Sequence, residues 1–271
     1  MENILNMKTI LIVSFCCVAI SAVTSGSPSW AAIRTEIVPY KQGDAQLIGF
    51  LAYDDTVKGP RPAVLLVHEW WGLNDYIKRR TEQIASLGYI AFAADIYGNG
   101  FVTKDPNEAG AMAGKFRGSD RKLLRERVNA GLQVLMNHQL TDKQRIAAIG
   151  YCFGGTTVLE LARSGAAIAG VVSFHGGLDT PNPEDARNIK AKVLVLHGAD
   201  DPNVPAAQVS AFQEEMRKAK VDWQMVMYGG AVHSFTNPDS GSDPSRGAAY
   251  NEKADERSWE HMKVFFVEIF K

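Results

Sequence analysis

Short apolar runs alternate with longer helix-like segments along most of this chain of 271 residues. Ala63 to Val67 is continuously apolar, as expected of a strand buried on both faces of a parallel sheet. The predicted strands span residues 35–40, 46–53, 63–67, 89–94, 145–150, 167–173, 192–197 and 222–227, and the first two form an antiparallel pair with Gly43 at the turn. The predicted helices span residues 75–87, 107–116, 120–138, 156–164, 184–189, 206–219 and 254–270. This alternation predicts an α/β fold with a doubly wound, mostly parallel sheet flanked by helices, and a site at the carboxyl ends of the strands.

The first 31 residues have the pattern of an export signal. Lys8 supplies a positive charge, residues 9–23 are apolar, and Ser29 and Ala31 are small side chains at positions that a signal peptidase reads. The apolar stretch is about 15 residues, shorter than the roughly 20 of a membrane-spanning helix, and an uncleaved anchor is the alternative. We therefore expect an exported protein, periplasmic or secreted, with no stable membrane association after cleavage.

Residues 32–271 are predicted to form one domain, because no internal repeat, linker or second boundary interrupts them. The charges nearly cancel, with 29 Lys and Arg against 30 Asp and Glu, and no basic stripe is present. A nucleic-acid partner is therefore not expected. No H-x-x-x-H or His-x-His spacing predicts a metal site, and we expect neither a metal nor another cofactor.

One thiol stands out in the predicted mature domain, because the other two cysteines, at positions 16 and 17, lie in the export signal. Cys152 sits in Gly150-Tyr151-Cys152-Phe153-Gly154, with a predicted strand before it and a helix after it. Such a strand–turn–helix context lifts the central residue of G-x-nucleophile-x-G above a parallel sheet. The alternative is a buried structural cysteine beside a tight turn.

A histidine and an acid follow the thiol in the order typical of a hydrolase triad. His233 lies on a loop after the last predicted strand, where its free ring nitrogen could reach a thiol. The loop after strand 192–197 carries Asp200 and Asp201, and by composition either one could orient the histidine.

A further loop, His68-Glu69-Trp70-Trp71-Gly72, follows the buried strand 63–67. In this kind of fold that loop supplies one N–H of an oxyanion hole and the residue after the nucleophile supplies the other, which assigns Trp70 and Phe153. Glu69 is a carboxylate aimed into the same cleft, where it could accept the proton of the thiol.

Together these segments resemble the dienelactone hydrolases, or carboxymethylenebutenolidases, a branch of the α/β-hydrolase fold with a cysteine nucleophile. The resemblance runs from about residue 34 to the C-terminus. It rests on five motifs, namely His-Glu-x-x-Gly at 68–72, Asp-Ile-Tyr-Gly at 95–98, Gly-Tyr-Cys-Phe-Gly-Gly at 150–155, the Asp-x-x-Val-Pro loop that begins at Asp201, and His-Ser-Phe at 233–235. It implies a triad of Cys152, Asp201 and His233, a thioester acyl-enzyme, and a role for Glu69 in holding or activating the thiol.

The resemblance also bears on the substrate, because family members that act on dienelactone carboxylates carry arginines at the positions of Asn99 and Asn237. Asparagine lacks the charged grip that a carboxylate favours, which argues for a neutral substrate. Arg117 or Arg246 could still reach the pocket. The expected aromatic contacts are Trp70, Trp71, Tyr97, Phe153 and Phe235, and they favour a small, partly apolar ester or lactone.

Four other functions remain open. A thioesterase or a cysteine peptidase could use the same scaffold and triad. A redox thiol protein would need only Cys152, although C-x-x-C is absent. A non-catalytic binding module is a third possibility, since fold alone does not establish function. A metallohydrolase would have to draw on His68, Glu69, His175 and His197.

Overall fold

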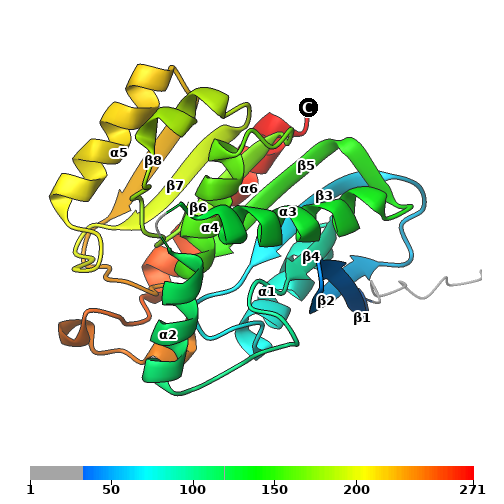
Figure 1. Cartoon of the computed structure of the whole chain (residues 1–271), viewed down its shortest axis with the longest axis horizontal. Helices are drawn as coiled ribbons and strands as arrows, with labels where there is room; N and C mark the ends of the chain where they lie inside the picture. Colours follow the sequence, from blue (N-terminus) through cyan, green and yellow to red (C-terminus); the bar gives the residue numbers. More distant parts are fainter. Residues whose placement is uncertain (1–32, 119) are drawn as a thin grey trace, which may run out of the picture. The chain divides into compact units, whose positions relative to one another are not determined.

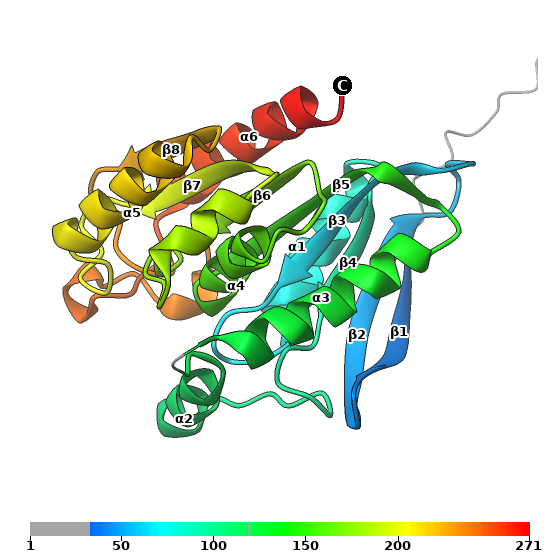
Figure 2. The same ribbon diagram turned by 45° about the horizontal axis from the view of Figure 1, so that its top comes forward.

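The computed structural model describes residues 33–118 and 120–271, so the predicted export signal lies outside the described residues. Within them, eight strands form one sheet in the order β1-β2-β4-β3-β5-β6-β7-β8 (Figure 1). The strands are β1 (Ile33–Gln42), β2 (Ala45–Asp54), β3 (Arg61–Val67), β4 (Ile90–Ala94), β5 (Thr141–Tyr151), β6 (Gly170–Phe174), β7 (Lys192–Gly198) and β8 (Trp223–Tyr228). β1 and β2 form the predicted antiparallel pair at one edge of the sheet (Figure 2), and β4 through β8 are parallel to β3.

The helices cover both faces of the sheet. α1 and α6 pack on one face, and α3, α4 and α5 pack on the other (Figures 1 and 2). Their bounds are α1 (Asp75–Ser86), α2 (Pro106–Phe116), α3 (Lys122–Asn137), α4 (Phe153–Arg163), α5 (Ala206–Ala219) and α6 (Glu252–Ile269). Three short 3₁₀ turns complete the described chain, η1 (Pro183–Asn188), η2 (Pro238–Ser240) and η3 (Pro244–Arg246). The predicted doubly wound α/β fold is therefore confirmed.

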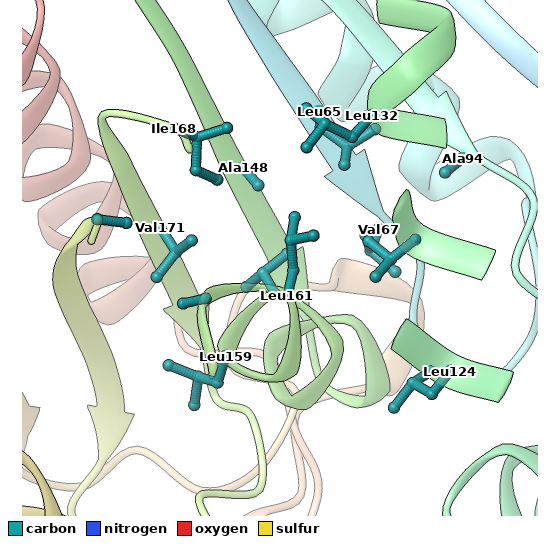
Figure 3. Packing of buried hydrophobic residues seen from close by; sticks show 14 of the residues in the cluster. Leu65, Val67, Ala94, Leu124, Leu132, Ala148, Leu159, Leu161, Ile168 and Val171 are labelled. Atoms are coloured by element: carbon teal, nitrogen blue, oxygen red, sulfur yellow. The ribbon is translucent and has the colours of Figure 1, made fainter. Parts of the chain in front are cut away.

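Strand β3 shows why the core has two layers. Leu65 and Val67 belong to the cluster under α3 and α4 (Figure 3), whereas Val64 and Leu66 belong to the cluster under α1 and α6. Successive side chains of a strand point to opposite faces, so a strand covered on both sides is apolar throughout. All four side chains are fully buried, and truncating one of them, as in Leu65→Ala, would cost about 2–5 kcal/mol.

Several predicted elements differ from the structure in kind or extent. Strand β5 begins at Thr141, four residues before its predicted start, and β6 begins at Gly170, three residues after. The predicted helix 184–189 is the 3₁₀ turn η1, and α4 begins at Phe153, three residues before its predicted start. Gly154 and Gly155 have low intrinsic helix propensity, so the sequence pattern placed the start after them. Tertiary packing holds both glycines in the first turn of the helix instead.

The carboxyl ends of the parallel strands carry the residues of interest. Glu69 follows β3, Cys152 follows β5, Asp201 follows β7 and His233 follows β8. Parallel strands bring these ends to one edge of the sheet, where α/β folds place their sites. No helix among the described residues is both long and apolar enough to cross a bilayer.

Candidate active site

The turn between β5 and α4 holds Cys152 in a strained backbone conformation, with φ 55° and ψ −114°. The turn is tight enough to require glycine on both sides. A Cβ on Gly150 would lie 2.0 Å from the carbonyl oxygen of Gly154, and a Cβ on Gly154 would lie 2.2 Å from that of Val67. Strain of this kind persists only where the surroundings impose it, and it commonly marks a functional position. The glycine spacing that identified the turn in the sequence is thus a steric requirement of this fold.

Three side chains meet at this turn. The Nε2 atom of His233 lies 3.0 Å from the Sγ atom of Cys152, and its Nδ1 atom lies 2.8 Å from Oδ2 of Asp201. The other oxygen of Asp201 accepts the N–H of Asn203 at 2.8 Å. Asp200 points elsewhere and accepts the N–H of Gly230 at 2.8 Å. Of the two candidate acids, the structure therefore brings Asp201 to the histidine.

The imidazole of His233 is set up to carry a proton. Burial lowers the pKa of His233, but the charge of Cys152 and the hydrogen bond to Asp201 outweigh burial and raise it to about 10. Because the raised pKa means that the proton stays on the ring below about pH 10, His233 can hold a thiolate at Cys152 as an ion pair and later donate that proton.

The loop after β3 presents the amide of Trp70 opposite the turn. The imidazole of His68 accepts the N–H of Ile96 at Nε2, 3.3 Å away, so the neutral ring carries its proton on Nδ1. That Nδ1–H donates to the carbonyl of Glu69 at 2.6 Å. This carbonyl and the N–H of Trp70 belong to one planar peptide, so His68 fixes the direction of the N–H. Neither this N–H nor that of Phe153 has a hydrogen-bond acceptor among the described residues, which suits an oxyanion hole.

Glu69 reaches the loop that carries His233 rather than the thiol. Its two oxygens accept hydrogen bonds from Oγ of Ser234, at 2.5 Å, and from Nδ2 of Asn237, at 2.6 Å. Burial raises the pKa of Glu69 and these two hydrogen bonds oppose the rise. Direct contact of Glu69 with Cys152, as the sequence suggested, is not seen. Ser234 and Asn237 were missed as its partners, although their places one and four residues after His233 put them on the same loop.

A cleft of about 770 Å³ opens above the thiol. Its wall is partly apolar, from Trp70, Trp71, Ala113 and Phe153, and partly polar. The polar part is lined by Arg117, Asp179, Asn203, Gln208, Asp239, Ser240 and Arg246, and Cys152, His233 and Ser234 also line the cleft. The apolar and charged sides together would suit a small molecule with an apolar part and a polar or charged substituent.

Four of the predicted substrate contacts are wrong, because these residues do not line the cleft. Tyr97 is buried beside Phe153 and donates its hydroxyl to the carbonyl of Trp70 at 3.0 Å. Asn99 is exposed in a left-handed turn, with φ 55°. Phe235 is fully buried, and Asn237 is committed to Glu69. Each residue lies in a motif or within two residues of one, but none of the four lines the cleft.

Comparison with known proteins agrees with the geometry. A model of the dienelactone hydrolase family matches residues 47–270. The chain belongs to the dienelactone hydrolase family. This confirms the resemblance that the five motifs indicated.

Several proteins in this family resemble the chain over nearly its full described length. A "putative carboxymethylenebutenolidase" of Saccharolobus solfataricus is 28% identical over 265 residues, covering 86% of this chain and 98% of that protein. A solved structure known as m3DLH is 41% identical, with a TM-score of 0.85, covering 89% of this chain and all of that one. The crystal structure of P91, a dienelactone hydrolase-like promiscuous phosphotriesterase from metagenomic libraries, is 42% identical, with the same TM-score and the same coverage. The protein is therefore a hydrolase of the ester or lactone type that acts on a small molecule.

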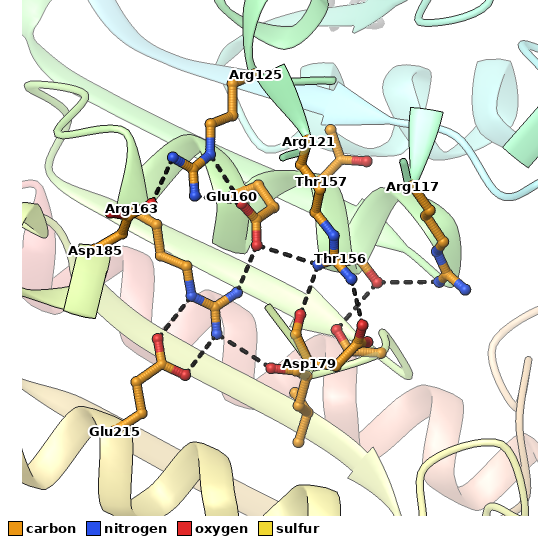
Figure 4. Close-up of polar contacts among 12 residues, drawn as sticks. Arg117, Arg121, Arg125, Thr156, Thr157, Glu160, Arg163, Asp179, Asp185 and Glu215 are labelled. Carbon is orange, nitrogen blue, oxygen red and sulfur yellow. Dashed lines mark hydrogen bonds and ion pairs between the residues drawn. The ribbon is translucent and has the colours of Figure 1, made fainter. Parts of the chain in front are cut away.

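One wall of the cleft in this family member is the segment Gly177–Asp179, whose backbone is held by buried side chains (Figure 4). Thr156 donates to the carbonyl of Gly177 at 3.0 Å, Arg163 to that of Leu178 at 3.1 Å, and Arg121 to that of Asp179 at 2.6 Å. Buried backbone acceptors need such partners because water cannot reach them. The segment belongs to no helix or strand, yet its position is fixed.

Beneath this wall lies a network of charged side chains. Arg121, Arg125 and Arg163 converge on the fully buried carboxylate of Glu160, and Arg163 also pairs with Glu215 at 2.7 Å (Figure 4). Removing Glu160 would take away the carboxylate that three arginines share, and breaking a buried ion pair costs about 3–5 kcal/mol. Sequence reasoning missed this network because its members come from α3, α4 and α5 and share no short motif.

Two of the three histidines proposed for a metallohydrolase are engaged in other contacts. His68 and His175 hydrogen-bond backbone atoms and a threonine hydroxyl. Across residues 33–118 and 120–271, no group of three or more His, Cys, Asp or Glu is arranged to hold a metal ion. The described site thus offers a thiol and an imidazole as its reactive groups.

Proposed function

We propose that this protein hydrolyses carboxylic esters or lactones through Cys152, His233 and Asp201, with a thioester acyl-enzyme. The observation that carries the proposal is the position of His233, 3.0 Å from the sulfur and 2.8 Å from the carboxylate, below an open cleft. A nucleophile, a base in contact with it, and an acid that orients the base together make an acyl-transfer site.

The chemistry follows from these contacts. The thiolate of Cys152 attacks the carbonyl carbon, and the N–H groups of Trp70 and Phe153 stabilise the oxyanion. The tetrahedral intermediate collapses with cleavage of the C–O bond, and the leaving oxygen takes the proton of His233. His233 then removes a proton from water, which attacks the thioester and releases the acid. The expelled sulfur is again a thiolate beside an imidazolium. From a lactone, both product groups remain on one hydroxy acid.

The cleft suggests a substrate with an apolar part and an anionic substituent. Trp70 and Trp71 provide apolar surface, while Arg117 and Arg246 belong to the polar part of the lining and are both exposed. The two asparagines that favoured a neutral substrate, Asn99 and Asn237, do not line the cleft. An arginine supplies several donors that a carboxylate can accept, so we propose that an anionic substituent is accepted.

Turnover assays on the purified protein test the proposal. A panel of esters, lactones, thioesters and anilides should show hydrolysis of esters or lactones, and Cys152→Ala should abolish it. A matched substitution of a distant side chain, His261→Asn on α6, should leave it unchanged. Iodoacetamide should inactivate the wild type by labelling one site. Preference for thioesters or anilides would favour the thioesterase or peptidase alternatives, and full activity after complete labelling would refute the role of the thiol.

Phosphotriester hydrolysis is a second candidate. The metagenomic relative at 42% identity is described as a promiscuous phosphotriesterase. The same thiolate could attack phosphorus and expel an aryloxide, and water would then cleave the phosphorus–sulfur bond. Turnover of an aryl dialkyl phosphate by the wild type that is lost in Cys152→Ala would support this activity. Equal rates in the wild type and in Cys152→Ala would exclude a reaction through the thiol.

We also propose that the protein is exported and that the first 31 residues are removed. The support is the charged, apolar and small-residue pattern at the start of the chain. N-terminal sequencing of protein from the periplasm or the medium should find a new end close to residue 32. An intact start in cytoplasmic protein would overturn this proposal.

A further inference from the structure

A buried histidine beside the triad has no part in the mechanism above. His175 follows β6, is fully buried, and has a left-handed backbone, with φ 39°. Its Nδ1 atom lies 3.1 Å from the backbone nitrogen of Cys152, and its Nε2 atom lies 2.8 Å from Oγ1 of Thr236. It therefore touches the nucleophile turn with one nitrogen and the loop of His233 with the other.

The partners of His175 determine its tautomer. A backbone N–H can only donate, so Nδ1 must be an acceptor, and the neutral ring must then carry its proton on Nε2. Nε2–H donates to Thr236, whose hydroxyl also lies 2.7 Å from that of Tyr76. Burial, together with the positive charge of His233, lowers the pKa of His175 well below its ordinary value. His175 is thus a neutral link and not a second base.

Each end of this link bears on a reacting group. The N–H of Cys152 is shared between His175 and the carbonyl of Phe174, 3.0 Å away, so strand pairing alone does not hold the strained turn. The amide of Phe153, one of the two proposed oxyanion donors, is the next along the chain. Thr236 is three residues after His233 on the same loop. One rigid ring therefore sets the separation between the turn and the loop.

We propose that His175 is a positioning residue that holds the nucleophile turn and the loop of His233 at their reactive separation. The inference rests on the proposed roles of Cys152 and His233. Its ring also packs against Phe235, with centroids 5.1 Å apart, so space filling is the competing explanation. The two explanations differ, because packing requires only bulk whereas positioning requires an acceptor at one place and a donor at another.

Amide side chains can separate the two ends of the link. Asparagine at position 175 places an oxygen near the site of Nδ1 and keeps an acceptor for Cys152, but it cannot reach Thr236. Glutamine places an N–H near the site of Nε2 and keeps the donor for Thr236, but it loses the acceptor. Phenylalanine keeps the bulk and loses both. The three variants His175→Asn, His175→Gln and His175→Phe therefore form a matched set.

Two measurements on the folded variants distinguish positioning from packing. Ultraviolet absorbance of the thiolate reports the contact of Cys152 with His233, and kcat and KM report the reaction. We expect His175→Phe to lower kcat by roughly ten- to a hundredfold at similar KM, the scale on which misplaced reacting groups act. Thiolate absorbance should fall in His175→Phe, His175→Asn and His175→Gln, because each variant breaks the link at one end or at both, although glutamine and phenylalanine keep the bulk of the side chain. Wild-type absorbance and kcat in folded His175→Phe would overturn the proposal.

Thr236 gives a second test that leaves the ring in place. Thr236→Val removes the hydroxyl and should lower both thiolate absorbance and kcat, whereas Thr236→Ser restores the hydroxyl and should recover both. If the His175 variants do not fold, an unchanged Thr236→Val overturns the proposal by itself. Absorbance and alkylation of the thiol do not require turnover. Failure of the proposed hydrolysis, seen as activity in Cys152→Ala, is therefore distinguishable from failure of this inference.

Discussion

The triad and the polar wall of the cleft differ in how their side chains are held. Each triad member is fixed by a partner, since His233 contacts both Cys152 and Asp201. On the wall, Arg117 has one hydrogen bond, to Thr156 at 3.2 Å, and Arg246 is exposed. Groups held by partners are aligned with a reacting bond before substrate arrives, whereas exposed cations with few partners become ordered only when they bind an anion. We therefore expect substitutions in the triad to change kcat for every substrate, and substitutions on the wall to change KM for some substrates.

The largest effect should come from the acid of the triad. Asp201→Asn should lower kcat by roughly ten-thousandfold for all substrates, because loss of the analogous acid from a serine triad has that effect. Asp200→Asn, one residue away, weakens at most the hydrogen bond that the N–H of Gly230 donates and should change kcat little. Steady-state kinetics on both variants make the comparison. The opposite ranking would show that the acid had been assigned to the wrong residue.

The same variant should also move the pH profile. Asp201 raises the pKa of His233, which reaches about 10 in the wild type. The imidazolium that protonates the leaving oxygen is lost as the pH rises through that value. The alkaline fall of kcat/KM should thus lie near pH 10 in the wild type and at lower pH in the residual activity of Asp201→Asn. A fall at the same pH in both proteins would mean that His233 is not the group that titrates.

Glu69 should have an intermediate effect. Glu69→Gln retains one acceptor for Ser234 or Asn237 but removes the other, and so loosens the loop that carries His233. We expect about a tenfold lower kcat with KM nearly unchanged, since a hydrogen bond to a charged group contributes about 1.5–3 kcal/mol. Kinetics with two unrelated substrates measure this. A change in KM for one substrate alone would place Glu69 with the wall rather than with the triad.

This difference also explains what could be predicted from the sequence. Cys152, Asp201 and His233 sit at strand ends, and the steric demands of a sharp turn force glycines at Gly150 and Gly154, so short motifs reveal them. The wall depends on where α2 and the 3₁₀ turn η3 pack, and no local pattern encodes that. Position within a motif was a poor guide to which side chains face the cleft, as the buried side chains of Tyr97 and Phe235 show.

The smallest effect, and the most selective, should come from the wall itself. Arg117→Gln combined with Arg246→Gln should raise KM for an ester or lactone that bears a carboxylate by roughly tenfold, and leave its kcat and the kinetics of a neutral ester nearly unchanged. Both guanidinium groups are solvent-exposed, so water and salt screen their charges, and each contact contributes only about 1 kcal/mol or less. The difference in KM between the variant and the wild type should accordingly shrink as salt is added to both assays. Arg217→Gln is a matched control, because it removes an exposed arginine that pairs with Glu214 on α5 and does not line the cleft. An equal rise in KM for the neutral ester would show that the two arginines shape the cleft instead of binding an anion.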